Sequence, residues 1–125
     1  MRLLIDTQIY LWVLEDSSRL SRRAVRVMKE ADGVYVSSAT IWEASIKIRK
    51  GSLKIDPSIL VAYISESGMH ELPVLASHAV LVATMPTYHK DPFDRLIVAQ
   101  AMQETMRLLT SDTLLQRYSP LVELV

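Results

Sequence analysis

The stretch His89-Lys90-Asp91-Pro92-Phe93-Asp94-Arg95-Leu96-Ile97-Val98-Ala99-Gln100-Ala101 decides the fold and indicates where a functional site lies. Asp91 is placed as a helix N-cap, and Pro92 follows at the first helical position, where its missing N–H breaks no hydrogen bond. Asp94 then falls in the first turn, near the positive end of the helix dipole. The nearly unbroken apolar run over residues 96–102 predicts a helix that is buried on more than one side. A carboxylate is therefore held at the start of a buried helix, where aspartate is also a common cap.

The composition indicates a small globular protein. The chain has 125 residues, which we expect to form a single domain covering residues 1–125, and half of them are hydrophobic. Fourteen basic residues balance fourteen acidic ones, which argues against nucleic-acid binding by overall charge but leaves room for a local basic groove. Cysteine is absent, so disulfides and thiolate metal sites are excluded and carboxylates and histidines remain as metal ligands.

The N-terminal residues indicate where the protein is found. The chain starts at once with a strand-like run at residues 3–5, without the apolar core of a signal peptide. No apolar run reaches the length of a transmembrane helix. We therefore expect a cytoplasmic protein with no membrane partner.

Strand-like and helix-like segments alternate along the chain. Short apolar runs predict strands at residues 2–5, 34–36, 69–72, 107–109 and 121–124. Helices are expected at residues 8–14, 22–31, 38–49, 57–67, 76–84 and 92–105, with a short one ending near residue 118. Because the strands are solidly apolar, we expect an α/β fold in which helices cover both faces of a parallel sheet.

Four acids fall close to the ends of predicted strands. Asp6 follows the first strand and Asp112 the fourth, while Glu43 lies in the helix after the second strand and Asp94 in the helix before the fourth. Ligands of open parallel sheets bind beyond the carboxyl ends of the strands, so we expect the four acids to meet there. Carboxylates this close repel each other unless cations hold them together. An all-oxygen site suits Mg²⁺ or Mn²⁺, ions that serve phosphodiester chemistry.

Each of these acids also has an ordinary structural explanation. Asp6 and Asp112 could cap the helices that follow them. Glu43 follows Thr40 at the spacing of a capping box and precedes Lys47 by one helical turn, the spacing of a surface ion pair. Four separate accidents would be needed to bring the acids to one pole, so we favour a shared site.

Four stretches of the chain resemble PIN-domain proteins, specifically the toxin ribonucleases of VapBC-type toxin–antitoxin pairs. They are Leu3-Leu4-Ile5-Asp6-Thr7, Val36-Ser37 with Ile41-Trp42-Glu43, Asp91-Pro92-Phe93-Asp94-Arg95-Leu96-Ile97, and Leu109-Thr110-Ser111-Asp112. The resemblance implies a PIN-like three-layer α/β/α fold whose five-strand parallel sheet has the order 3-2-1-4-5. It also implies that the catalytic and metal-binding residues are Asp6, Glu43, Asp94 and Asp112.

The activity implied by the resemblance is that of a Mg²⁺-dependent endoribonuclease, with Mn²⁺ as a substitute ion and products that carry a 5′-phosphate and a 3′-hydroxyl. A VapB-type antitoxin partner and a homodimer are implied as well. In this interpretation Asp6 and Asp94 are direct ligands, Glu43 ligates the ion or positions water, and Asp112 acts through a water molecule. Asp91 stays open between a cap, which we favour, and an additional ligand.

Contacts with RNA would have to come from local polar and basic residues. The cluster Lys47, Arg49 and Lys50 shares a helix with Glu43 and is the first candidate for phosphate contact. The candidates closest to the acids are Thr7, Lys47, Arg95, Thr110 and Ser111, although Thr110 and Ser111 could equally serve as helix caps. His89 borders the site, but a lone loop histidine is expected to be exposed. Trp12 and Trp42 are expected to be packing residues, and base stacking stays open for whichever of them is exposed.

Two other functions fit parts of the sequence. A catalytically inactive PIN-like module could bind RNA or a protein, although the presence of all four acids argues against it. A receiver-type signalling domain is also doubly wound and has an acidic pocket. It would need a phospho-acceptor aspartate at the end of the third strand, where residues 69–73 supply none.

Overall fold

The computed structural model describes residues 1–125 and contains one five-stranded sheet. The strands are β1 (Arg2–Ile5), β2 (Gly33–Ser37), β3 (His70–Leu72), β4 (Arg107–Thr110) and β5 (Val122–Leu124). Their order is β3-β2-β1-β4-β5, and each neighbouring pair is parallel. The predicted strand order is therefore confirmed.

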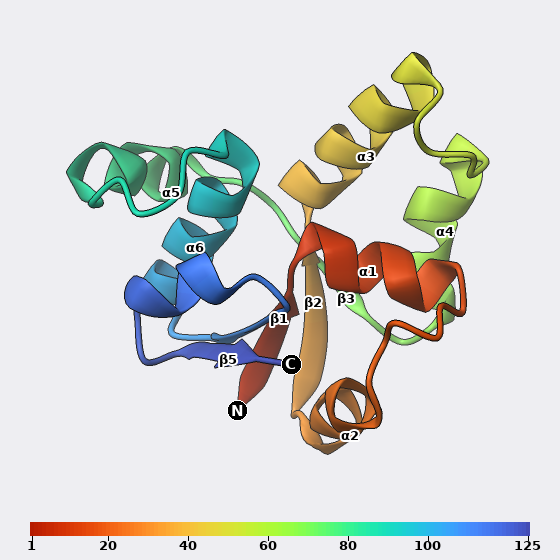
Figure 1. Cartoon of the computed structure of the whole chain (residues 1–125), viewed down its shortest axis with the longest axis horizontal. Coiled ribbons are helices and arrows are strands. Elements are labelled where there is room, and N and C mark those ends of the chain that lie inside the picture. The colour runs from red at the N-terminus through yellow and green to blue at the C-terminus, as the bar shows by residue number, and fades with distance from the viewer.

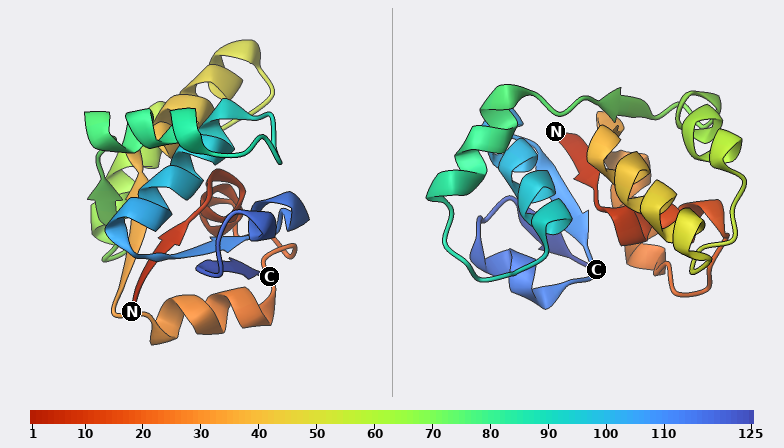
Figure 2. Two further views of the ribbon diagram at one scale, coloured as in Figure 1. Left: turned by 90° about the vertical axis from the view of Figure 1, so that its left-hand side faces the viewer. Right: turned by 90° about the horizontal axis from the view of Figure 1, so that it is seen from above.

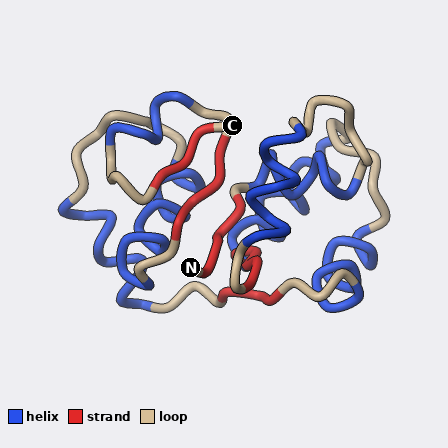
Figure 3. The backbone as a smooth tube through the Cα atoms, turned by 90° about the horizontal axis from the view of Figure 1, so that it is seen from below, coloured by secondary structure: helices blue, strands red, loops and turns tan.

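Helices cover both faces of this sheet. They are α1 (Thr7–Leu14), α2 (Arg22–Glu30), α3 (Ser38–Lys50), α4 (Pro57–Glu66), α5 (Ala76–Leu81) and α6 (Pro92–Glu104), with 3-10 helices η1 (Val82–Thr84) and η2 (Thr113–Arg117). Figure 1 shows α5 and α6 on one side of the sheet and α1, α2 and α4 on the other. In Figure 3 the strands form a central layer between two groups of helices, so the three-layer α/β/α architecture is confirmed. None of the helices combines the length and apolar character needed to cross a membrane.

Two apolar cores stabilise the layers, one on each face of the sheet. Leu3 and Ile5 of β1 belong to the core that includes Tyr10 of α1, whereas Leu4 belongs to the core that includes Ile97 of α6. All five side chains are fully buried. Successive side chains of a strand point to opposite faces, so the central strand β1 contributes to both cores.

Helix α6 begins and packs as its sequence predicts. The Asp91 carboxylate caps it, accepting the backbone N–H groups of Phe93 at 2.8 Å and Asp94 at 3.2 Å, and Pro92 occupies the first helical position. Residues 97–101 are all buried, because α6 lies between the sheet and neighbouring helical segments. Its first turn is therefore rigidly placed relative to the sheet.

The carboxyl ends of β1 and β4 lie next to each other. Ile5 is in register with Leu109, and the backbone N–H of Asp6 donates to the Leu109 carbonyl at 3.1 Å. The right view in Figure 2 shows these two strands side by side. After β1 the chain continues into α1 on one face of the sheet, whereas it enters β4 from α6 on the opposite face. The carboxyl ends of β1 and β4 therefore form the switch point of the fold.

Candidate active site

An acidic pocket of about 470 Å³ lies at the switch point, beyond the ends of β1 and β4. No hydrophobic residue lines it. The lining residues are Asp6, Thr7, Gln8, Glu43, Lys47, Asp91, Asp94, Ser111, Asp112 and Thr113. The structure therefore brings together the four acids that the sequence singled out and adds Asp91 to them.

Asp6 is almost fully buried, with 4% of its surface exposed. It caps α1, since its Oδ1 accepts the backbone N–H of Ile9 at 2.9 Å, and its Oδ2 accepts the hydroxyl of Thr110 at 2.5 Å. Burial raises the pKa of Asp6 to about 6, against the lowering effect of these two hydrogen bonds. The negative charges of Asp112 and Glu43 raise the pKa further. The charge on Asp6 is thus poorly compensated by the protein.

Asp94 lies in the first turn of α6, and its pKa is raised in the same way as that of Asp6. Burial is the main cause that raises its pKa to about 7, and the charges of Asp91, Asp6 and Glu43 add to the effect. His89 acts in the opposite direction, with its Nε2 3.4 Å from Asp94 Oδ2. A cation placed beside Asp94 would favour its ionised form.

Glu43 projects from α3 into the same pocket. Its Oε2 lies 3.6 Å from the Lys47 ammonium one turn later, which confirms the expected ion pair. Its Oε1 is buried and has no hydrogen-bond partner. The capping-box alternative is wrong, because Ser37 caps α3 and the Thr40 hydroxyl lies 3.0 Å from the Thr7 hydroxyl. An orphaned, buried carboxylate oxygen is costly unless a ligand completes it.

Asp112 is held at both carboxylate oxygens. Oδ1 accepts the backbone N–H of Leu114 at 2.9 Å and so caps η2, while Oδ2 lies 2.7 Å from Nε2 of His89. Its own backbone N–H donates to the Thr110 hydroxyl at 3.0 Å. Thr110 therefore links Asp112 to Asp6 through one buried oxygen atom.

The pocket carries more negative charge than the protein itself balances. Five carboxylates line it, and Lys47 is its only lining cation. The N-termini of α1 and α6 point positive helix-dipole ends at it, which offsets part of this charge. The unpartnered Oε1 of Glu43 and the raised pKa values of Asp6 and Asp94 fit a site that takes up a divalent cation. Ligand-type atoms of His89, Asp94 and Asp112 also lie within 4.8 Å of one another.

The residues expected to contact substrate fall into two groups. Lys47, Ser111 and Thr7 line the pocket, although the Thr7 hydroxyl is engaged with Thr40. Thr110 is fully buried and does not line it, so its partners are protein groups.

Arg95 does not lie where we expected. Its guanidinium donates to the backbone carbonyls of Pro86 at 3.0 Å and Val82 at 3.1 Å, and it is absent from the pocket lining. Consecutive residues of a helix point about 100° apart, so a side chain next to Asp94 is turned away from the acids. Arg95 therefore acts as a clamp, by which we mean that its guanidinium holds the loop before α6 through hydrogen bonds to backbone carbonyls.

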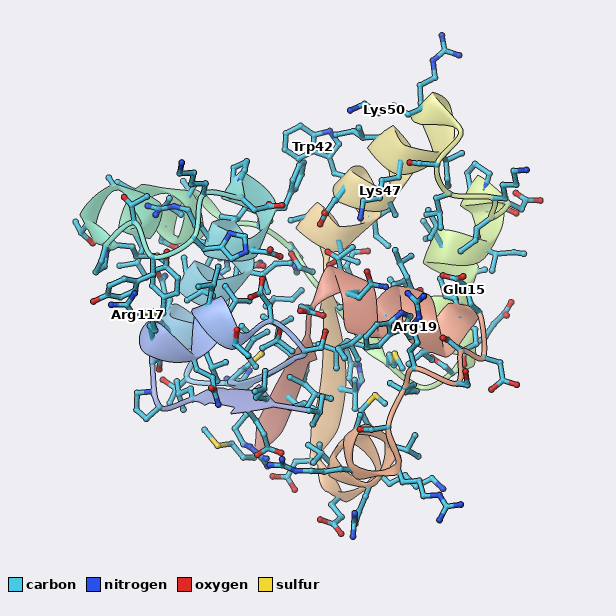
Figure 4. All side chains as sticks on the ribbon, in the orientation of Figure 1. Glu15, Arg19, Trp42, Lys47, Lys50 and Arg117 are labelled. Carbon is cyan, nitrogen blue, oxygen red and sulfur yellow. The ribbon has the colours of Figure 1, made fainter.

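His89 and Trp42 differ in exposure from what the sequence predicts. His89 is only 17% exposed at its side chain and contacts two acids of the pocket. Trp42 is 62% exposed instead of packed in the core, with its ring edge-on to Phe93 at 5.0 Å between centroids. Figure 4 shows Trp42 on the side of α3 that faces α6, whereas Lys50 lies at the far end of this helix.

The chain has a five-stranded parallel sheet of this order, and acids follow two neighbouring strands at its switch point. This arrangement is the fold of one known family of proteins. The family profile described as "PIN domain" matches residues 3–120, so the chain belongs to the PIN-domain family. The resemblance seen in the four sequence stretches is thereby confirmed. A receiver domain is excluded, also because β3 ends at Leu72 without a following carboxylate.

Individual relatives show how far the similarity extends. The chain is 25% identical to Ribonuclease VapC22 of Mycobacterium tuberculosis over 118 residues, which is 92% of this chain and 90% of that protein. It matches the fold of VapBC2 from Rickettsia felis bound to a promoter DNA fragment, with a TM-score of 0.74, 17% identity and coverage of 100% and 98% of the two chains. The DNA-bound VapBC of Salmonella typhimurium gives a TM-score of 0.68 at 14% identity, with 100% and 97% covered.

Proposed function

We propose that this protein is a divalent-cation-dependent endoribonuclease and the toxin of a toxin–antitoxin pair. The observation that carries this proposal is the pocket in which Asp6, Glu43, Asp94 and Asp112 converge while a buried Glu43 oxygen has no partner. Membership of the PIN-domain family and the similarity to a protein named as a ribonuclease support it.

The ion we infer is Mg²⁺, with Mn²⁺ able to replace it, because the donors are carboxylate oxygens. Asp6 and Asp94, whose pKa values are raised, and Glu43, which has an unpartnered oxygen, would hold it, whereas Asp112 would act through water. When bound, such an ion makes water a better nucleophile and offsets the negative charge of a phosphodiester.

Protein groups around the acids would complete the site. Lys47, whose side chain is 40% exposed at the pocket wall, would contact a phosphate oxygen beside Glu43. Thr110 keeps Asp6 in one orientation through its 2.5 Å hydrogen bond. Water attacks the phosphorus, the bond to the 3′-oxygen breaks, and the products carry a 5′-phosphate and a 3′-hydroxyl.

The partner we infer is a VapB-type antitoxin, since solved structures with this fold include VapBC complexes. We also infer a homodimer in the cytoplasm, and the exposed apolar side chains Trp42, Leu75 and Val80 support a second protein surface. Light scattering on the purified chain tests the dimer, and a monomer mass would contradict it. Co-purification with the product of a neighbouring small reading frame tests the antitoxin.

Cleavage of total RNA by the purified protein tests the activity. Asp94→Asn should abolish cleavage while leaving the fold intact, because asparagine keeps the size of the side chain but not its charge. EDTA should stop the wild-type reaction, and added Mg²⁺ or Mn²⁺ should restore it. Glu66→Gln is the matched control, since Glu66 is an exposed acid outside the pocket and its loss should change nothing.

The outcomes separate the two candidate functions. Cation-dependent cleavage that Asp94→Asn removes supports the nuclease, and sequencing the product ends identifies the RNA. Binding of RNA without cleavage by the wild-type protein favours the catalytically inactive module instead. Cleavage that survives in Asp94→Asn would remove this pocket as the active site.

A further inference from the structure

His89 is held at all four of its polar atoms. Its backbone N–H donates to the Tyr118 hydroxyl at 2.9 Å, and its carbonyl oxygen lies 3.5 Å from the Arg95 guanidinium. In the ring, Nδ1 accepts the backbone N–H of Asp91 at 3.0 Å, and Nε2 lies 2.7 Å from Asp112 Oδ2. Because every polar atom of His89 is hydrogen-bonded, the position and orientation of its imidazole in the site are fixed.

These contacts decide which ring nitrogen carries the proton. The Asp91 N–H points at Nδ1, so a proton on Nδ1 would place two donors face to face. The neutral ring therefore has its proton on Nε2, the atom that faces the acids. Nε2 has no free lone pair in this arrangement, so the cluster of His89, Asp94 and Asp112 is not a three-ligand metal site.

Asp112 is more exposed than Asp94 and Glu43, so its orientation depends most on its hydrogen bonds. Its side chain is 34% exposed, compared with 20% for Asp94 and 13% for Glu43. It starts a 3-10 helix of only five residues, and its sole other side-chain bond is to the backbone N–H of Leu114. Without the imidazole, Oδ2 of Asp112 would be free to turn toward solvent.

We propose that His89 is a positioning residue that holds Asp112 in the acidic pocket by donating its Nε2 proton to Oδ2. This inference rests on the proposed nuclease function and assigns one residue outside the acids to it. Arg95 and Tyr118 acquire a role through it, because they fix the backbone from which the imidazole projects. Outer-shell groups of a metal site typically change metal affinity or activity by about 10–100-fold when they are removed.

Two amide variants test this assignment because each keeps a different half of the imidazole. In His89→Gln the side-chain amide nitrogen falls at the position of Nε2 and keeps the donor to Asp112. In His89→Asn the side-chain oxygen falls at the position of Nδ1 and keeps the acceptor for the Asp91 N–H, but no donor reaches Asp112. The measurements are the Mg²⁺ concentration for half-maximal thermal stabilisation and the kcat and KM for RNA cleavage.

We expect His89→Asn to need about tenfold more Mg²⁺ and to lose about tenfold in kcat, and His89→Gln to stay within about threefold of wild type. A loss of equal size in both variants, or wild-type behaviour of His89→Asn, would overturn the proposal. Wild type and Asp94→Asn run alongside. If wild type does not cleave, or Asp94→Asn does, the proposed nuclease site fails instead, and the Mg²⁺ titration still reports on His89.

Discussion

Replacing Asp6 with asparagine should make the protein more stable when no divalent cation is present. Asp6 is the most buried of the four acids, and burial raises its pKa from 3.8 to about 6. At pH 7.5 this difference means that the ionised carboxylate destabilises the folded state by about 3 kcal/mol. Asparagine carries no charge and is as good an N-cap for α1, so most of this penalty should be relieved.

The expected gain is smaller than the full penalty. The amide of the variant would face the Thr110 hydroxyl, which now donates to Asp6 and would have to accept instead. Losing an acceptor for this buried hydroxyl costs about 1 kcal/mol. A net gain of about 2 kcal/mol remains, which corresponds to a rise in Tm of roughly 6–8 °C for a domain of this size.

Thermal unfolding in EDTA at pH 7.5 measures this gain. The penalty of Asp6 is fully present above its folded-state pKa of about 6 and disappears as the pH falls to the unfolded value of 3.8, so the advantage of the variant should shrink toward pH 4. Saturating Mg²⁺ should narrow the difference at pH 7.5, because it stabilises wild type by about 2.7 kcal/mol at 100 times Kd.

The matched control is Asp56→Asn. Asp56 caps α4 through the backbone N–H of Ser58, as Asp6 caps α1, but it lies at the surface. Its exchange should bring no gain in Tm. An unchanged or lower Tm for Asp6→Asn in EDTA would refute the idea that the pocket stores uncompensated charge.

Three further outcomes follow from the same contacts. Mg²⁺ affinity, measured by thermal shift, should fall about 20-fold between pH 8 and pH 6, because Asp94 and Asp6, with pKa values of about 7 and 6, both take up protons; a flat profile would contradict this. Thr110→Val should lower the free energy of unfolding in urea by about 2 kcal/mol, because an oxygen of Asp6 and the N–H of Asp112 lose their hydrogen-bond partner. Thr84→Val at the surface is the control and should change little. An equal loss in both variants would contradict the role of Thr110. Arg95→Lys should speed trypsin cleavage at Lys90 severalfold, because an ammonium cannot donate to the carbonyls of Pro86 and Val82 at once as the guanidinium does. Arg23→Lys is the control. Equal rates of cleavage at Lys90 in the two variants would contradict the clamp.

The sheet and the acids of the pocket were predictable because each depends on local signals. Asp6 directly follows an apolar strand. Asp91 and Pro92 are the residue types that favour the start of a helix, and α6 begins there. Strand ends in a parallel sheet converge at one edge whatever the intervening loops do. The order of the strands needed the family resemblance, since apolar runs alone do not say which strands are neighbours.

The role of the loop before α6 was beyond the sequence. His89 reaches Asp112 from a backbone that is held by Arg95 and by Tyr118, which lies 29 residues further along the chain. A loop has no periodicity from which such a contact can be inferred. Arg95 was misplaced for a related reason, because its neighbour in sequence is Asp94 while its partners are carbonyls of residues 82–89. Trp42 is exposed although its residue type favours burial.

Three carboxylates of this pocket, those of Asp6, Asp91 and Asp112, also begin the helices that follow them. Asparagine is accepted at such positions about as readily as aspartate. A single nucleotide change converts an aspartate codon into an asparagine codon, so under the proposed function one mutational step would silence the active site without making the chain misfold. The silenced chain would keep its shape and, under the same proposal, would still bind the antitoxin.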